Sequence, residues 1–444
     1  MNAKATWLGT TAALVVLVVG AAGLETAAQS RISINFLIAN VRVFDGERVH
    51  ERSQVAIEGG IIRAVGGERT AWRHLPVIDG TGATLLPGLI DAHLHVGNLE
   101  GLRQTNVNQL RQMLRFGVTT ALDMGAASVP ESQVFDVRSV ARVATDMADL
   151  RSAGFLASAR RPADSSRPIV STVEEATQFV AMRHSEGADY LKLQFNGVRS
   201  ASQGERNLDL AIAKALVDEA HARGMLAIAH IETLDDVAVA LSAGVDGLGH
   251  VWRRGGANSA EIARRIAERG VFVSATLSIP DGQLDGRASL LADPRFQSAL
   301  SGALKDQLGR SLVSRVTGVA PNTDEVRTAF AVQLAAVRSL HEAGARLLIG
   351  TDAAANTQPA AHGISVHREL ELFVRAGLSP TEALTAATAN AASAFRLVDR
   401  GRIATGRKAD LVLVRGDPTT DITATRDILR VWRDGVEFDR ALGH

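Results

Sequence analysis

The chain has 444 residues, a formal net charge of zero and 46% apolar residues. A chain of this length and composition can bury a large core, which excludes an intrinsically disordered protein, and its balanced charge gives no electrostatic reason to bind nucleic acid. It has no cysteine, which excludes disulfide bonds and thiolate metal sites. We therefore expect one large α/β domain with a smaller attachment.

Residues 1–28 have the pattern of an export signal. Lys4 precedes an apolar run at 12–24, and small residues at 26–28 offer a cleavage site. The alternative is an uncleaved membrane anchor, but the apolar run is shorter than the ~20 residues that span a bilayer. We predict a cleaved signal peptide and a mature protein that starts near Gln29. That protein would be periplasmic or secreted and would make no stable association with a membrane.

Short strand patterns separated by glycine turns follow this signal, and the same texture returns only near the C-terminus. The segments with strand patterns are 36–44, 54–57, 61–65, 77–78, 409–414 and 428–432. Because the two ends of the chain share this texture, we predict that residues 29–86 and 397–444 form one β-sandwich subdomain.

Strand and helix patterns alternate between residues 87 and 396. Strands are expected at 89–96, 119–124, 154–159, 190–195, 226–231, 247–251, 271–277 and 346–351. Amphipathic helices are expected between them, for example at 209–222, 235–243, 259–269 and 325–343. This order predicts a (β/α)8 TIM barrel, whose sites lie at the C-terminal ends of its strands. An open doubly wound sheet is the alternative, although its glycine-rich phosphate fingerprint does not follow the first strand.

Polar side chains stand at the predicted C-terminal ends of several strands. Asp91, His93 and His95 alternate along one face of the first strand, where two neutral imidazoles can hold a metal ion. Taken alone, these histidines could be ordinary residues at a strand end. The ends of strands four, five, six and eight add Lys192, His230, His250 and Asp352. Because such ends meet at one edge of a barrel, the combination favours a metal centre.

These residues and several motifs resemble the amidohydrolase superfamily, and within it the imidazolonepropionase-like and metal-dependent carboxypeptidase (Xaa-Pro dipeptidase-like) branch. The similar motifs include PGLIDAHLH at 87–95, GVTT at 117–120, GTD at 350–352, HRELEL at 367–372, GLSPTEAL at 377–384 and GRI with GRKADLV at 401–412. The resemblance covers about residues 35–437. It is specific for fold and metal chemistry and much less so for the substrate.

The resemblance implies two divalent metal ions, with zinc expected. The implied ligands are His93, His95 and Asp352 for the first ion, His230 and His250 for the second, and Lys192, carboxylated by CO2, as a bridge between both. Carboxylation needs a neutral amine, which burial beside cations favours. A water shared by the two ions would become a bridging hydroxide, and Asp352 would pass its proton to the leaving amine.

The candidate substrate contacts are Tyr190, Trp252, Arg253 and His362. Arg253 could clamp a substrate carboxylate at the barrel mouth, although a solvated loop arginine is the simpler interpretation. Tyr190 could hydrogen-bond near the metals or only pack, and His362 could approach the substrate or brace its loop. Asp91 is expected to be structural. The long connection at 278–323 is typical of a lid or a binding loop.

Three classes of reaction are compatible with such a centre, all on a small-molecule substrate. The first is hydrolysis of an amide bond in a dipeptide, an N-acyl amino acid or a related amide. The second is a lactonase or phosphotriesterase reaction, and the third and weakest is deamination, because deaminases generally lack the bridging lysine. A binding scaffold without catalysis would be expected to lack some ligands, whereas all six are present. A homo-oligomer is compatible with the sequence.

Overall fold

The computed structural model describes residues 35–96, 103–125, 131–159, 169–195, 207–256, 258–284, 286–309, 322–354 and 359–441. Every described element lies within residues 33–444, which form one compact unit. The predicted signal peptide therefore lies outside the described residues. Among the helices that the structure describes, none combines the length and the apolar character needed to cross a bilayer.

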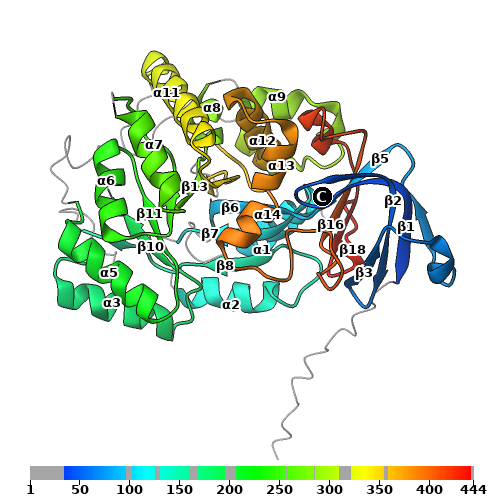
Figure 1. Cartoon of the computed structure of the whole chain (residues 1–444), viewed down its shortest axis with the longest axis horizontal. Coiled ribbons are helices and arrows are strands. Elements are labelled where there is room, and N and C mark those ends of the chain that lie inside the picture. The colour runs from blue at the N-terminus through cyan, green and yellow to red at the C-terminus, as the bar shows by residue number, and fades with distance from the viewer. Residues whose placement is uncertain are drawn as a thin grey trace, which may run out of the picture. The chain divides into compact units, whose positions relative to one another are not determined.

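Strands from both ends of the chain build one mixed sheet. Its order is β18-β17-β16-β5-β1-β2-β3, with β4 paired to β1 (Figure 1). The strands are β1 (Phe36–Phe44), β2 (Val49–Glu58), β3 (Ile61–Val65), β4 (Val77–Asp79), β5 (Ala83–Pro87), β16 (Leu411–Arg415), β17 (Ile428–Arg433) and β18 (Val436–Glu437). Gly59 and Gly60 both have positive φ in the tight turn between β2 and β3, as a two-residue hairpin turn requires. β16 pairs antiparallel with β5, so the two ends of the chain share this sheet.

Two parallel sheets hold the remaining strands. Their orders are β14-β13-β12-β11-β10-β9 and β15-β6-β7-β8. The strands are β6 (Leu89–His95), β7 (Val118–Asp123), β8 (Asp149–Ser152), β9 (Ala157–Ser158), β10 (Leu191–Gln194), β11 (Ala227–His230), β12 (Gly247–Gly249), β13 (Phe272–Ser274), β14 (Leu347–Leu348) and β15 (Ala353–Ala354). Nearly all their residues are buried, as expected for parallel strands covered by helices.

Helices follow most of these strands, and Figure 1 shows α3, α5, α6, α7 and α11 along the outside of β10, β11 and β13. The α-helices are α1 (Arg103–Arg115), α2 (Glu131–Ala141), α3 (Val173–Ser185), α5 (Leu210–Ala222), α6 (Leu234–Ala243), α7 (Ser259–Glu268), α8 (Ser278–Gln283), α9 (Gly286–Ala292), α10 (Gly302–Gly309), α11 (Thr323–Glu342), α12 (Ile364–Ala376), α13 (Pro380–Ala386) and α14 (Ala389–Ala394). Side-chain caps fix several of their N-termini. Thr172, Thr233 and Ser379 form capping boxes, each with an acidic residue three positions on, and Asp209 caps α5.

Two predicted strands are wrong in their extent, because each is divided between the two parallel sheets. The third was expected at 154–159, but only β9, which pairs with β10, lies in that range, and β8, which pairs with β7, precedes it at Asp149–Ser152. Gly154, with φ of 69°, lies in the break. The eighth was expected at 346–351, but it divides into β14 and β15 around Asp352, whose φ is 53°. The chain therefore turns at both places where one sheet gives way to the other.

The described part of the long connection is helical rather than an open loop. It contains α8, α9, the short 3-10 helix Pro294–Phe296 and α10. Asp281 on α8 forms a two-bonded ion pair with Arg368 on α12, at 2.8 Å for each bond. Asp293 forms a second ion pair with Arg426, at 2.7 Å. Two ion pairs therefore join this connection to α12 and to Arg426, where a lid or binding loop was expected.

Candidate metal centre

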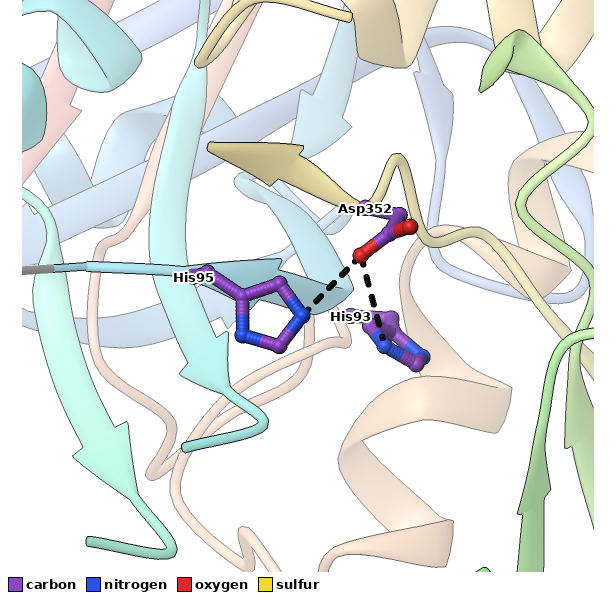
Figure 2. Close-up of side chains that lie close together, drawn as sticks. All are labelled: His93, His95 and Asp352. Carbon is purple, nitrogen blue, oxygen red and sulfur yellow. Dashed lines mark ion pairs between the residues drawn. The ribbon is translucent and has the colours of Figure 1, made fainter. Parts of the chain in front are cut away.

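Three metal-ligating side chains converge at the end of β6. His93 and His95 come from β6 itself, and Asp352 comes from the turn between β14 and β15 (Figure 2). The Oδ1 atom of Asp352 lies 3.0 Å from Nε2 of His95 and 3.7 Å from Nε2 of His93. One ligand atom from each of the three residues lies within 4.8 Å of the others. This spacing suits a single cation between them.

Backbone bonds between strands explain why these side chains meet. The amides of Thr351 and Asp352 both donate to the carbonyl oxygen of His93, at 3.0 and 2.7 Å. The carboxylate of Asp91 accepts bonds from the amide and the hydroxyl of Thr351 and from the amide of His93. Burial raises the pKa of Asp91 to about 7, although the bonds from Thr351 oppose this shift. Asp91 thus braces the ligand strands instead of facing the centre, which is the structural role expected of it.

The other three predicted ligands lie beside the first three. The ring of His250 lies 4.5 Å from that of His93 and 4.4 Å from that of His230, measured between centroids. Lys192 reaches the same place from β10. A Cβ atom on Gly249 would lie 2.5 Å from Nζ of Lys192 and 2.6 Å from Cε1 of His93. Glycine at 249 therefore leaves the space that the lysine and the imidazole occupy.

The electrostatics of these groups fit metal ligation. Burial, and then the charge of Lys192, lowers the pKa of His93 well below its ordinary value. Burial likewise lowers the pKa of Lys192 to about 7. Both ring nitrogens of His93 and Nζ of Lys192 are buried and make no hydrogen bond with described residues. Buried polar atoms without hydrogen bonds are costly, so the neutral imidazole of His93 and the amine of Lys192 fit residues that ligate divalent cations.

Two of the histidines have one ring nitrogen engaged by a neighbour. Nδ1 of His95 lies 2.6 Å from the carbonyl oxygen of Gly125, which can only accept, so Nδ1 donates and Nε2 faces Asp352. Nδ1 of His250 lies 2.7 Å from the hydroxyl of Thr276. Such partners commonly fix the tautomer and the orientation of metal-binding histidines.

Two of the candidate substrate contacts are buried and contact other parts of the chain. The Tyr190 hydroxyl donates to the carbonyl oxygen of Asp123, and its ring packs against Phe395 with 5.2 Å between centroids. Trp252 is 1% exposed and belongs to the main apolar core. Both residues lie within two positions of a proposed ligand in the sequence. The Tyr190 side chain, however, bonds the backbone and packs against Phe395, and the indole of Trp252 lies in the core.

The other two candidates differ in their exposure. Arg253 is exposed on the loop after His250. His362 is buried, and Nε2 lies 3.1 Å from the carbonyl oxygen of His95. Burial lowers the pKa of His362 to about 4, so its neutral ring donates to that carbonyl and braces its loop. On its other side His362 lines a cavity of about 990 Å³ along α1 and α10.

Sequence reasoning missed three residues that shape the centre. Thr276 gave no sequence signal. Glu369 lies in the HRELEL motif, but no role followed from the motif alone. Gly249 directly precedes a predicted ligand, and a glycine at a buried strand end is a recognised sign of close approach.

Histidines, a lysine and an aspartate buried at the ends of parallel strands form a candidate metal centre. The sequence matches the amidohydrolase family over residues 84–437. The chain therefore belongs to the amidohydrolase family, which confirms the resemblance found in its motifs.

Several known proteins are similar to parts or most of the chain. Imidazolonepropionase from Deinococcus deserti is 38% identical over 102 residues, which cover 22% of this chain and 25% of that protein. Ochratoxinase from Aspergillus niger is 24% identical over 279 residues, 61% of this chain and 50% of that protein. The matched segments thus span a quarter to a half of the length of these relatives.

Solved structures share the fold over a longer stretch. A Xaa-Pro dipeptidase with bound methionine has a TM-score of 0.72 at 22% identity, covering 91% of this chain and all of that chain. The ochratoxinase structure has a TM-score of 0.68 at 20% identity, covering 91% and 96%. At these identities the likeness concerns the fold.

Proposed function

We propose that this protein is a dinuclear metal-dependent hydrolase of amide bonds, with dipeptides or N-acyl amino acids as its substrate class. The grouping of His93, His95 and Asp352, with three further potential ligands beside them in a member of the amidohydrolase family, carries this proposal. The six potential ligands are His93, His95, Lys192, His230, His250 and Asp352. The most direct support comes from the buried nitrogens of His93 and Lys192, which make no hydrogen bond with described residues. Burying such atoms costs free energy unless another group, here a cation, interacts with them.

The proposed ligands divide between two sites. His93, His95 and Asp352 would hold one ion, His230 and His250 the other, and Lys192, carboxylated on Nζ, would contact both. When bound, two divalent ions, with zinc expected, would acidify a water and polarise the scissile carbonyl. The depressed pKa of Lys192 supports its role, since carboxylation requires the neutral amine.

Asp352 is the proposed proton carrier. Its Oδ1 atom faces the two β6 histidines, and its backbone amide is fixed to His93. A carboxylate held in this way can accept a proton from the attacking water and deliver it to the leaving amine. His362 is less suited to this task, because its ring nitrogen is already used by the carbonyl of His95.

Arg253 is the proposed recognition group for a substrate carboxylate. Burial and the charges of His230 and Lys192 lower the pKa of His250, and the charge of Arg253 contributes to the same shift. Arg253 follows the proposed ligand His250 by three positions and is exposed. An exposed guanidinium beside a hydrolytic centre suits a substrate with a free carboxylate, which dipeptides and N-acyl amino acids carry.

The decisive experiment compares substrates and two arginine variants. Metal-reconstituted protein is assayed with N-acyl amino acids, their C-terminal carboxamides, dipeptides, lactones and paraoxon. We expect the free acids to be preferred, and Arg253→Gln to raise KM for the acids but not for the carboxamides. Arg254→Gln, the neighbouring exposed arginine, is the matched control and should leave both unchanged. Faster turnover of lactones or paraoxon than of any amide would overturn the proposed reaction.

The proposed architecture is the closed barrel with an attached β-sandwich. Backbone bonds from Asp189 to Ser152, at 2.9 Å, and from Ala92 to Ile349, at 2.8 Å, bridge the two parallel sheets at both of their junctions and support closure. Phe36 stacks on Trp432 across strands from opposite ends of the chain, which supports a separate core there. We propose the barrel for residues 87–396 and the sandwich for 29–86 with 397–444.

We also propose that residues 1–28 direct export to the periplasm or the medium and are then removed. The small-molecule substrate would be met there, with no stable membrane association. Mass spectrometry of protein secreted by the natural host should find an N-terminus near Gln29. A membrane-bound product that retains Met1 would contradict cleavage.

A further inference from the structure

The turn after β13 holds a threonine in a costly backbone conformation. Thr276 has a φ of 56°, and it is the only β-branched residue with positive φ in the described part of the chain. Branching at Cβ makes this conformation unfavourable, so the surrounding contacts must hold it in place. The conformation places Oγ1 of Thr276 2.7 Å from Nδ1 of His250, inside the protein. The strain thus accompanies a contact with a proposed ligand.

A buried carboxylate holds this turn from the neighbouring helix. Glu369, on α12, is fully buried, and its two oxygens accept bonds from the next two amides of the turn. Oε1 accepts from the amide of Leu277 at 2.8 Å, and Oε2 accepts from the amide of Ser278 at 2.6 Å. Burial raises the pKa of Glu369 to about 8, and the two bonds from the amides of Leu277 and Ser278 oppose this rise because they favour the carboxylate. They can offset the strain at Thr276, which directly precedes them.

The same turn also reaches the strand that carries Asp352. The hydroxyl of Ser278 donates to the carbonyl oxygen of Thr351, at 3.1 Å. Thr351 in turn donates to Asp91, which accepts the amide of His93. Glu369 therefore holds a turn that contacts His250 through Thr276 and the Asp352 strand through Ser278.

We propose that Glu369 and Thr276 are positioning residues for the metal centre, with Glu369 holding the turn and Thr276 fixing the tautomer of His250. The inference rests on the proposed function, because that function makes His250 a metal ligand. If the hydroxyl of Thr276 accepts from Nδ1, the neutral ring keeps its lone pair on Nε2 for a metal ion. Were Nδ1 the acceptor, Nε2 would carry the proton and could not ligate. The HRELEL motif thus contributes a carboxylate that organises the centre without touching it.

The test uses substitutions that remove the hydroxyl of Thr276 or the carboxylate of Glu369 but keep the side-chain volume nearly constant. Thr276→Val removes the hydroxyl at nearly constant volume, and Thr276→Ser restores it. Glu369→Gln replaces one accepting oxygen with an NH2 group that must face a backbone N–H. Glu371→Gln, on the same helix, removes a charge that pairs with Arg368 and Arg426 and is the matched control.

Two readouts are measured on each protein. Competition with a chelator gives the affinity for each zinc ion, and 15N NMR of histidine-labelled, metal-free protein gives the tautomer of His250. We expect Thr276→Val and Glu369→Gln to weaken binding of one ion by about 10–100-fold, the usual effect of losing such a partner. Thr276→Ser and Glu371→Gln should bind like the wild type. The wild type should carry its His250 proton on Nδ1, and Thr276→Val should lose this preference.

The two readouts distinguish failure of this inference from failure of the proposed function. A wild-type protein that binds no metal would overturn the proposed function, and the NMR result would still decide whether Thr276 fixes the tautomer. Unchanged zinc affinity in Thr276→Val, or a His250 proton on Nε2 in the wild type, would overturn the positioning role. Thr276→Val removes only one hydroxyl, so the test does not depend on Glu369→Gln folding.

Discussion

Two regions of the molecule bury ionisable side chains, and they differ in whether these side chains form ion pairs. Near the mixed sheet, Arg400 lies 2.6 Å from Asp149, and Arg433 lies 3.1 Å from Asp410, with all four side chains buried. At the ends of the parallel strands, Lys192 is equally buried but makes no hydrogen bond with described residues. One region therefore pairs its buried cations with carboxylates, and the other leaves a buried amine without a partner.

The pKa shifts follow the same division. Burial alone would raise the pKa of Asp410, but the charges of Arg433 and Arg400 outweigh it and hold that pKa below its ordinary value. For Lys192 burial dominates, and the pKa falls to about 7. Buried charges of opposite sign stabilise each other within the chain, whereas the buried amine of Lys192 and the imidazole of His93 suit groups that a bound cation would complete. The comparison supports a structural role for the paired cluster and the proposed metal site for the cluster around Lys192.

The largest expected effect lies in the proposed centre. Asp352→Asn keeps the shape and one ligating oxygen but removes the proton carrier, so we expect kcat to fall by about 10²–10⁴-fold with most of the metal retained. His93→Ala should instead lose metal, and added zinc should recover part of the activity. Metal content and turnover are measured on the same samples. Near-normal turnover in metal-replete Asp352→Asn would show that another group carries the proton, and His362 would be the next residue to test.

In the paired region the effect should fall on stability. Arg400→Met leaves Asp149 buried without its nearest cation, and breaking a buried pair in this way costs about 3–5 kcal/mol. Metal content per folded molecule should stay at the wild-type level. Arg402→Met removes a more exposed pair with Glu47 and should cost about 1 kcal/mol or less. Urea unfolding of the metal-free proteins measures the free energy of unfolding of both variants. Equal losses of this free energy would contradict the distinction between the buried and the exposed ion pair.

The smallest effect concerns acid stability. Burial lowers the pKa of His367 to about 3, so the folded state binds fewer protons than the unfolded state below pH 6.5. Stability from this group is complete above pH 6.5 and is lost as the pH falls toward 3, with a slope of up to about 1.4 kcal/mol per pH unit. His367→Gln should therefore lose less stability than the wild type between pH 6.5 and pH 4.5. His184→Gln, at an exposed position, serves as the control and should follow the wild type.

The sequence predicts the location of the centre because its residues stand at strand ends, where alternation and the order of the elements determine position. His93, His95 and Asp352 can be placed together on this basis alone, and the structure brings them together. Side-chain direction is less accessible from the sequence. Trp252 follows a ligand by two positions, yet its ring lies in the core, which neighbouring residues along the chain do not reveal.

The fold is predictable to a similar depth. Alternating strands and helices indicate the parallel sheets, and the shared texture of the two ends indicates the mixed sheet. The division of the third and eighth strands was missed, because it depends on which neighbour each half pairs with. Thr276 was missed for the same reason, since its partner His250 lies 26 positions away.

The most direct test of the central claim is the metal content of the purified protein and of Lys192→Ala, by elemental analysis after growth with zinc. We predict close to two divalent ions per chain in the wild type, and loss of metal and activity together in Lys192→Ala, with partial rescue by a small carboxylic acid. Lys214→Ala, at an exposed lysine, should match the wild type. Full metal content and full activity in Lys192→Ala would contradict the proposed bridge and the dinuclear centre built on it.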